Sequence, residues 1–559
     1  MSPQMVNRVA VAILVAAGLA AYAGSFSGPF VLDDPSSITA NPTIRRLWPP
    51  WDVLATPRAN VTVQGRPVLN LSFALNHAVS GYEVWSYHAL NLAIHLLAGL
   101  ALFGLVRRTL AVSAACAWIG GAAGPAAVLP EGRGRTASAL GLAVALLWTV
   151  HPLQTESVTY VVQRAESLMG LFYLLTLYCF VRYAEGGAAA RPSGWHAGAV
   201  LAGLAGMATK EVMVTAPVMI VLYDRTFFAG SFRAAWLQRR AFHLSLAATW
   251  LLLLVCLQRG GGNRGGAIGL GSGVAWWDYG LTQFEAIGRY VLLSFWPHPL
   301  VFEYGAFAVK RAADVLPWAA LVVPLAAGTL RALWRRPAAG FAGAWFFGIL
   351  APTSLVPGTS QMIVEHRVYL PLAGLLALSV CGGYALAVRW GGARPAPGRV
   401  AALALLLASA LGALTASRNA TYRTALGLWT ETVALRPHNP LAHHLLAEEL
   451  ARVGRHEEAL VHRQRAARLD PGFALAQERL GELLLRLGRP AEAETPLRAA
   501  LRLRPDFADA HNTLGALLAG KGRVDEAKAH VEKALALQPD FAEAHYNLAN
   551  LLAQQGLAA

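Results

Sequence analysis

The sequence predicts an all-α protein with two parts, a polytopic bundle of membrane helices followed by an α-solenoid of short repeats. Three observations support this fold class. Of the 559 residues, 55% are hydrophobic and only 14% are charged; the mean hydropathy is positive, at +0.42; and a 34-residue period runs through the C-terminal part. Ordinary soluble domains carry more charge for their apolar content. We place the membrane domain at 1–417 and the repeat domain at 418–559.

About eleven segments are long and apolar enough to cross the roughly 30 Å hydrocarbon layer of a bilayer. They are 7–23, 88–106, 137–153, 163–183, 194–209, 210–226, 240–257, 314–333, 339–355, 367–389 and 399–417. Two further segments, 61–79 and 281–296, are amphipathic and are expected to lie at the membrane interface. The small-residue run 111–128 fits either an extra hairpin or a loop.

Arginine-rich loops predict the orientation of the bundle. With the N-terminus in the cytoplasm, the cytoplasmic loops follow the positive-inside rule and carry Arg107, Arg108, Arg133, Arg135, Arg182, Arg191, Arg225, Arg233, Arg239, Arg240, Arg331, Arg335, Arg336, Arg389, Arg394 and Arg399. The outer side receives 24–87, 151–163, the turn at Lys210, 258–313 and 356–366. An odd number of spans sends the repeat domain to that side too. The abundance of Arg, Ala and Gly is typical of GC-rich bacteria, so we expect a bacterial inner-membrane protein, or an ER protein in a eukaryote.

The repeat domain carries the most specific signal in the chain. Proline, glycine and alanine recur every 34 residues, at Pro437, Pro471, Pro505 and Pro539, at Gly454, Gly488, Gly522 and Gly556, and at Ala459, Ala493 and Ala527. This is the tetratricopeptide (TPR) period. Full units are predicted at 440–473, 474–507 and 508–541, with partial units at both ends. Stacked helix pairs form a concave face, so we expect the array to dock a protein or peptide; a spacer or dimerisation element is the alternative.

Charge and cysteine content exclude two other classes. The net charge is +15, but the arginines lie between apolar segments and form no nucleic-acid-binding motif, so nucleic acid is not an expected partner. The four cysteines, Cys116, Cys179, Cys256 and Cys381, lie in or beside apolar runs. They therefore indicate neither a disulfide framework nor a zinc site.

Four polar clusters fall on the predicted outer face: the acidic pair at 33–34, HPLQTESVTYVVQRAES at 151–167, TKE at 209–211 and EHRVYLP at 365–371. Each alone is explained by a helix end, a turn or a local ion pair. Four on one face are harder to explain that way, because ionisable groups are costly at membrane depth and tend to mark a site.

Several stretches of the chain resemble a known family: GPFVLDDPSSITANPTIRRL (28–47), RPVLNLSFALNHAVSGYEVWSYHALNLAIHLL (66–97), WTVHPLQTESVTYVVQRAESL (147–168), TKEVMVTAPVMIVLYD (209–224), FWPHPLVFEY (295–304) and VEHRVYLP (364–371). Together with the TPR tail they are similar to the transmembrane and TPR-repeat-containing O-mannosyltransferases, polytopic glycosyltransferases of GT-C-like fold. The resemblance implies transfer of mannose or a related hexose from a polyprenyl phosphate to a protein hydroxyl. In a bacterial relative the carrier would be undecaprenyl phosphate, and in a eukaryote dolichyl phosphate.

The resemblance also implies roles for individual residues. The acidic pair of the first outer loop supplies the base that deprotonates the acceptor, which selects Asp33, with Asp34 holding the acceptor or tuning its neighbour. A leaving phosphate needs positive charge, for which the candidates are Arg164, Lys210 and Arg367. The residues expected to orient these cations or to bind sugar are His151, Glu156, Glu166, Glu211, Glu365 and His366. No particular cofactor is indicated; a divalent metal on Asp33, Asp34 and Glu156 stays open, although no ligand spacing indicates one.

Two alternatives from other classes remain at this stage. A membrane-anchored TPR scaffold without catalysis explains the tail but leaves the charged groups of the outer face without a role. An envelope polymer ligase or a transporter is the second alternative. A transporter is expected to place its charges near the midplane on broken helices, whereas these charges gather at one surface.

Overall fold

A computed structural model gives the fold. It describes residues 2–57, 62–111, 131–186, 194–259, 275–306, 309, 311–357, 362–391, 393–554 and 556. The run 112–128 lies outside them. The described residues are helical, without strands, as predicted, and divide into two compact units: 1–302 with 306–424, and 303–305 with 425–559.

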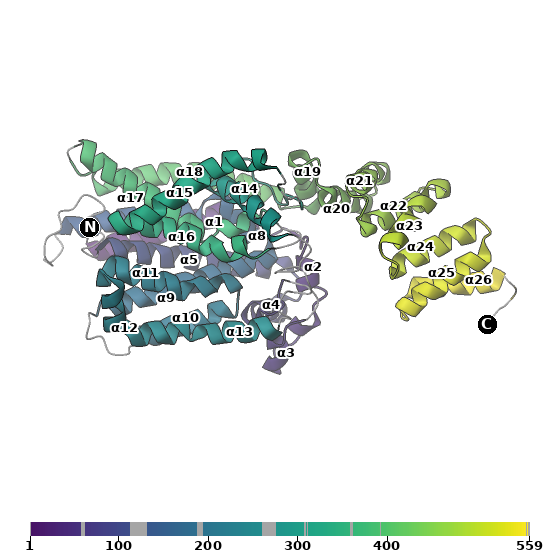
Figure 1. The fold of residues 1–559 in the computed structure, drawn as a ribbon, viewed down its shortest axis with the longest axis horizontal. Helices are drawn as coiled ribbons and strands as arrows, with labels where there is room; N and C mark the ends of the chain where they lie inside the picture. Colours follow the sequence, from purple (N-terminus) through teal and green to yellow (C-terminus); the bar gives the residue numbers. More distant parts are fainter. Residues whose placement is uncertain are drawn as a thin grey trace. The chain divides into compact units, whose positions relative to one another are not determined.

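The first unit is a bundle of long helices that lie side by side (Figure 1). In chain order these helices are α1 (Pro3–Tyr22), α5 (Val84–Ala111), α7 (Glu131–Thr149), α9 (Arg164–Ala184), α10 (Gly194–Met207), α11 (Ala216–Asp224), α12 (Phe232–Ala247), α13 (Thr249–Arg259), α15 (Ala312–Arg335), α16 (Pro337–Leu355), α17 (Pro371–Gly391) and α18 (Pro397–Thr421). Their apolar composition is what makes the chain a multi-pass membrane protein.

Within the described residues, nine helices are long and apolar enough to span a membrane, or ten if one bent pair counts as a span. The eleven predicted segments all fall on helices. The difference between eleven predicted spans and nine observed ones has two physical causes. The segment predicted at 137–153 bends by 54° between 134–149 and 152–159, where Pro152 has no N–H to continue the ladder. The segment predicted at 194–209 forms only the 14-residue α10, about 21 Å at 1.5 Å per residue.

Two helices, α4 (Pro67–Ser80) and α14 (Trp276–Phe295), and several short elements connect the helices of the bundle. The short elements are α2 (Asp34–Ser37), η1 (Pro42–Ile44), α3 (Pro50–Leu54), η2 (Pro152–Gln154), α8 (Thr155–Thr159), η3 (Val161–Gln163), η4 (Glu211–Thr215), η5 (Arg225–Ala229) and η7 (Glu365–Val368). Figure 1 shows α2, α3, α4 and α8 at the same end of the bundle. The two segments predicted to be amphipathic helices correspond to α4 and α14. All four polar clusters of the sequence lie in or beside these short elements.

Apart from Trp250, which lies within a span, the exposed tryptophans occur near both ends of the spans. Those on the segments of the predicted outer side are Trp48, Trp51, Trp85, Trp276, Trp277 and Trp296. Those beside the arginine-rich loops are Trp195, Trp236, Trp334 and Trp390. Indole rings favour the two membrane–water interfaces, so this distribution agrees with a bundle that crosses a bilayer.

The second unit consists of α19 (Ala425–Leu435), α20 (Pro440–Arg452), α21 (His456–Leu469), α22 (Ala474–Arg486), α23 (Pro490–Leu503), α24 (Ala508–Gly520), α25 (Val524–Leu537) and α26 (Ala542–Gln554). The turns inside three consecutive helix pairs contain Gly454, Gly488 and Gly522 with φ of +81°, +70° and +74°. Residues that carry a side chain rarely adopt this left-handed backbone conformation, so glycine recurs at these positions.

Two glycines of α24 give a matched test of the repeat packing. A Cβ at Gly515 would lie 2.6 Å from Val531 Cγ2 and 3.2 Å from the Ala527 carbonyl oxygen, whereas one at Gly520 meets nothing within 4 Å. We expect Gly515→Ala to destabilise the α24–α25 pair by about 1–3 kcal/mol through overpacking. Gly520→Ala should be neutral or slightly stabilising. Hydrogen exchange of the α24 and α25 amides across a urea series in the full chain measures both, and equal protection in the two variants would contradict this packing.

Candidate functional site

The second carboxylate of the acidic pair is a structural anchor. Asp34 is fully buried, and its two oxygens accept hydrogen bonds from the backbone N–H groups of Val31 (2.9 Å) and Val162 (2.7 Å). These bonds hold the turn at the start of α2 against η3, which lies 128 positions later in the chain. Burial and the neighbouring Asp33 charge raise the pKa of Asp34, while the two backbone N–H groups oppose that rise.

The first carboxylate is in a different environment. Asp33 is only half-buried, and its backbone N–H donates to the hydroxyl oxygen of Tyr160 (2.9 Å). Burial raises the pKa of the Asp33 carboxyl, and a hydrogen bond from the Tyr160 hydroxyl partly opposes this rise. The preceding Leu32 has φ of +50°, a left-handed conformation that is strained for a non-glycine residue and often found at functional turns.

Tyr160 joins the acidic pair to the rest of the site. Its side chain is 2% exposed, and its ring packs edge-on against Phe302 with centroids 5.2 Å apart. Its hydroxyl is within electrostatic reach of Asp33, Asp34 and Glu156. Sequence reasoning did not single it out, although it lies inside the cluster 151–167.

Arg164 is placed differently from the expectation that it binds the donor phosphate. Its guanidinium has no exposed surface. Nε donates to Asn91 Oδ1 (2.5 Å), Nη1 to the Ser72 carbonyl (3.0 Å) and Nη2 to the Tyr87 carbonyl (3.0 Å). The guanidinium also stacks 4.6 Å from the Phe73 ring centroid. With all three nitrogens engaged, this side chain braces α9 against α4 and α5, and we no longer assign it to phosphate.

Two ion pairs, one buried and one partly exposed, lie at the start of η4. Lys210 Nζ is 2.5 Å from Glu166 Oε1, and Arg66 Nη2 is 3.0 Å from both carboxylate oxygens of Glu211. Arg66 was not among the residues predicted from the sequence. Its position in the sequence could have identified it, because it is an arginine just before a proline on the side where the positive-inside pattern leaves few basic residues.

Arg367 and Glu166 line one small cavity together with Met169, Val212, Ile349, Thr353, Leu370 and Pro371. Arg367 is half-buried, and its Nη1 donates to the Met362 carbonyl (3.3 Å). The candidate cations Lys210 and Arg367 therefore meet around Glu166. Among the three predicted phosphate ligands, Arg367 is the least buried residue.

The remaining predicted residues make specific internal contacts. Glu156 accepts from His366 twice, at Nδ1 (2.6 Å) and at the backbone N–H (3.0 Å). Glu365 accepts from the Val301 N–H (2.7 Å). His151 accepts from the Leu153 N–H at Nδ1 (3.2 Å), and its Nε2 donates to the Ser294 carbonyl (3.2 Å); it shapes the bend after α7.

The described residues therefore divide the candidates into an acidic turn and a charged cluster. The acidic turn consists of Asp33, Asp34 and Tyr160. The charged cluster consists of Arg66, Glu156, Glu166, Lys210, Glu211, His366 and Arg367, and the charges of Lys210, Glu166, Arg367 and Arg66 all act on His366. No group of three or more His, Cys, Asp or Glu side chains in the described part of the chain could hold a metal ion. A metal shared by Asp33, Asp34 and Glu156 does not fit this geometry, because both Asp34 oxygens already bind backbone N–H groups.

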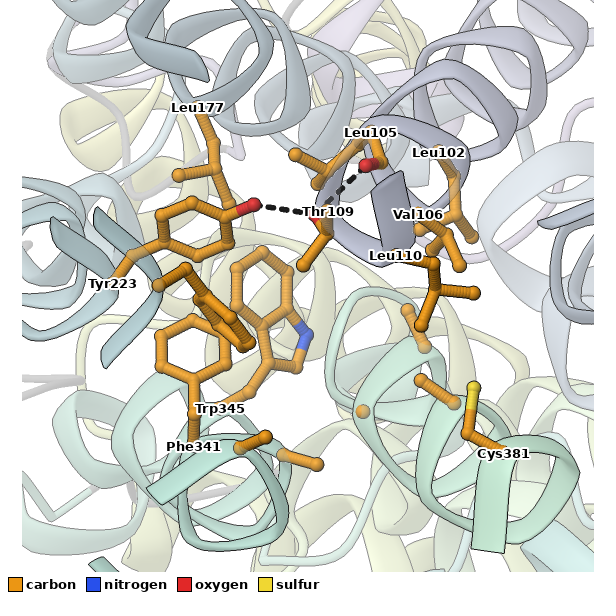
Figure 2. A pocket seen from close by; sticks show the side chains of 16 residues that line it. Leu102, Leu105, Val106, Thr109, Leu110, Leu177, Tyr223, Phe341, Trp345 and Cys381 are labelled. Atoms are coloured by element: carbon orange, nitrogen blue, oxygen red, sulfur yellow. Dashed lines mark hydrogen bonds between the residues drawn. The ribbon is translucent and has the colours of Figure 1, made fainter. Parts of the chain in front are cut away.

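A larger cavity lies elsewhere, among α5, α9, α11, α16 and α17 (Figure 2). Its wall is apolar apart from Thr109, whose hydroxyl is hydrogen-bonded to that of Tyr223 (Figure 2). Leu102, Phe341, Trp345 and Cys381 contribute much of the lining. With no charged group to act on a sugar or a phosphate, this cavity is not the candidate active site.

Comparison with known proteins identifies TPR repeats in this chain and proteins that are similar to it. Family models described as "TPR repeat" and "Tetratricopeptide repeat" match residues 517–556, and 444–508 and 478–527, respectively. Protein O-mannosyl-transferase TMTC2 of Mus musculus is 31% identical over 218 residues, 37% of this chain and 23% of that protein. Protein O-mannosyl-transferase F38B6.6 of Caenorhabditis elegans is 24% identical over 478 residues, 82% of this chain and 63% of that protein.

These relatives and repeats confirm the predicted resemblance to TPR-containing protein O-mannosyl-transferases. The chain spans less than a quarter of the mouse relative's length. A crystal structure of MamA is also similar, with 23% identity and a TM-score of 0.23, over 24% of this chain and 77% of that chain.

The anchoring role of Asp34 leads to a direct prediction. Asp34→Asn replaces one carboxylate oxygen by an NH₂ group, so either the Val31 or the Val162 N–H loses its acceptor. A buried donor without a partner costs about 1–3 kcal/mol, and we expect the turn at 31–37 to open. Asp33→Asn should leave the turn closed. Limited proteolysis of the detergent-solubilised variants, mapped to this turn, would reveal the difference; equal cleavage in both variants would refute the anchoring role.

Proposed function

We propose that this chain is a membrane glycosyltransferase that moves mannose or a related hexose from a polyprenyl-phosphate donor to a hydroxyl of a protein acceptor, on the extracytoplasmic face. The similarity to named protein O-mannosyl-transferases supports the reaction class. The observation that carries the proposal is the half-buried Asp33, whose backbone N–H donates to the Tyr160 hydroxyl. Asp33 directly precedes α2, one of the short elements that gather at one end of the bundle (Figure 1).

In this proposal Asp33 is the general base. The acceptor oxygen attacks the anomeric carbon while Asp33 takes the hydroxyl proton. One C–O bond forms to the acceptor, and the bond between the anomeric carbon and the phosphate oxygen breaks. Because the leaving group is already a phosphate, no carboxylic acid has to protonate it, unlike in glycoside hydrolysis. One accessible carboxylate therefore suffices, and Asp34 serves by holding the turn.

Positive charge for the leaving phosphate comes from the charged cluster. Arg367 is the proposed contact, because it is half-buried, whereas the side chains of Lys210 and Arg66 are only 8% and 5% exposed. A guanidinium can bind two phosphate oxygens at once. The ion pairs hold the surrounding dipoles in place before the donor arrives, so little reorganisation is needed during transfer.

The localisation and the acceptor belong to the same proposal. The arginine-rich loops favour an inner-membrane protein with its charged cluster and its TPR array outside the cytoplasm, and the array would dock the protein acceptor or a partner. A non-catalytic membrane scaffold is the competing function; it predicts that the full chain binds no lipid-linked sugar.

Asp33→Asn should lower the transfer rate by about 10²–10⁴-fold, since the amide cannot accept the proton. The measurement is transfer of labelled mannose from undecaprenyl- or dolichyl-phosphate mannose by the purified chain. Asp52→Asn, an exposed acid in α3 of the same loop, is the matched control and should keep the parent rate. A wild-type rate in Asp33→Asn would exclude the base role.

The pH dependence provides a second readout of the same base. Asp33 works only when deprotonated, so the rate falls as pH drops through its pKa. Burial raises that pKa above the usual value near 4, so the acid limb should lie above the range of an exposed aspartate. Tyr160→Phe removes the hydrogen bond that opposes the rise and should shift the limb further upward.

Arg367→Ala should weaken use of the donor by about 1.5–3 kcal/mol, the range for a charge-assisted hydrogen bond, with Arg367→Lys restoring only part of it. Arg311→Ala changes an exposed arginine of the preceding outer loop and should have little effect. Donor titrations with the detergent-solubilised chain separate the variants. Unchanged donor use in Arg367→Ala would reassign Arg367 to a structural role.

A further inference from the structure

Six exposed side chains form one surface on the first outer loop: Arg45, Arg46, Leu47, Trp48, Trp51 and Leu54, which we name the Arg–Trp surface. Trp48 and Trp51 are 76% and 65% exposed, and their rings lie 6.2 Å apart. Single exposed apolar residues are ordinary. Four large apolar side chains within eight residues, next to two arginines, are not, and a contiguous patch of this kind marks an interaction surface.

The fold holds this surface outward. Ile44, just before this surface, and Val53, between Trp51 and Leu54, are completely buried. Asn70 Nδ2 donates to the Val53 carbonyl (2.7 Å) and to Thr43 Oγ1 (2.9 Å), and Asn41 Nδ2 donates to Asn70 Oδ1 (2.9 Å). The two buried asparagines fasten the loop to α4, so the tryptophans cannot turn inward without breaking this network.

The neighbouring chain connects the surface to the point where a span begins. α3 packs on α4, and α4 leads within a few residues into α5, a membrane span that begins at Val84. The connection exposes Val79 (70%) and Trp85 (52%). Exposed apolar side chains therefore occur both on the Arg–Trp surface and at the start of a candidate membrane span.

We propose that the Arg–Trp surface lies in the headgroup layer of the bilayer, with Trp48 and Trp51 at the acyl boundary and Arg45 and Arg46 on the phosphates of anionic phospholipids. Indole rings favour this layer, and arginine beside them pairs with lipid phosphate. Both arginines lie on the side that the positive-inside pattern leaves poor in basic residues. Asp52 is the single acid between Arg45 and Leu54, so the segment keeps a net positive charge.

This contact would set the depth of the first outer loop. Asp33 precedes Arg45 by twelve positions. The buried Asn41 lies in the stretch between them and donates to Asn70 of α4, which makes the loop stiff. A loop held at the headgroup layer keeps its acidic turn level with lipid phosphates. The inference does not depend on Asp33 being a catalytic base.

Spin-label depth measurements on the full chain test the proposal. Trp48→Cys and Trp51→Cys carry the label, and Ala40→Cys, an exposed position of the same loop, is the matched control; the parent chain gives the background of the native cysteines. The protein is placed in nanodiscs of phosphatidylcholine, alone or mixed with phosphatidylglycerol. Accessibility to oxygen and to a water-soluble nickel chelate is then compared.

We expect labels at 48 and 51 to be several-fold less accessible to the nickel reagent than the label at 40, and more accessible to oxygen. The Arg45→Gln/Arg46→Gln pair should abolish any deepening caused by phosphatidylglycerol while leaving the protein inserted. Equal nickel access at all three positions would overturn the proposal. Protection from both reagents would also overturn it, because it would show that protein, such as a second copy, covers the surface.

Discussion

The buried guanidinium of Arg164 is the interaction on which the candidate site depends. An unpaired charge inside a membrane protein is costly. Here the cost is offset without a carboxylate partner in hydrogen-bonding contact, by an asparagine oxygen, two backbone carbonyls and an aromatic face. These acceptors come from α4 and α5, so one side chain at the start of α9 aligns three helices. The acidic turn rests against the chain immediately before it, through the Val162 N–H.

The two carboxylates of the acidic pair show how environment separates identical side chains. Both carboxylate oxygens of Asp34 accept hydrogen bonds from backbone N–H groups, so Asp34 is part of the scaffold. Asp33, one residue earlier, is only half-buried. The charged cluster follows a similar division. Its buried cations are paired with glutamates, and breaking such pairs is far more damaging than the pairs are stabilising. Their role is therefore best understood as fixing the geometry around Arg367.

Much of the fold was predictable, because hydrophobic length and a 34-residue period are properties of composition and spacing. The site was predictable only in outline. The polar clusters were identified because charged residues are conspicuous in apolar sequence. The sequence does not show which of these residues are buried, so Arg164 was predicted to bind phosphate. Which of Asp33 and Asp34 is accessible depends on the distant Val162 and Tyr160. Arg66 was missed because its partner, Glu211, lies 145 positions away. The turn predicted at 151–163 is present, but an apolar window does not show that the helix already ends at Thr149, before the end of the segment predicted at 137–153.

The bend after α7 has a consequence for residues far from any chemistry. Where the helix stops, backbone carbonyls lose their helical partners, and Thr149, Val150 and Val158 are buried away from water. Neutral side chains from other helices replace them: His95 donates to the Thr149 carbonyl (2.9 Å), Thr415 to the Val150 carbonyl (2.7 Å) and Asn91 to the Val158 carbonyl (3.0 Å). These three residues act as substitutes for the missing turn of helix. The interrupted segment is thus completed by α5 and α18, and a change of shape at 149–159 would have to carry both helices with it.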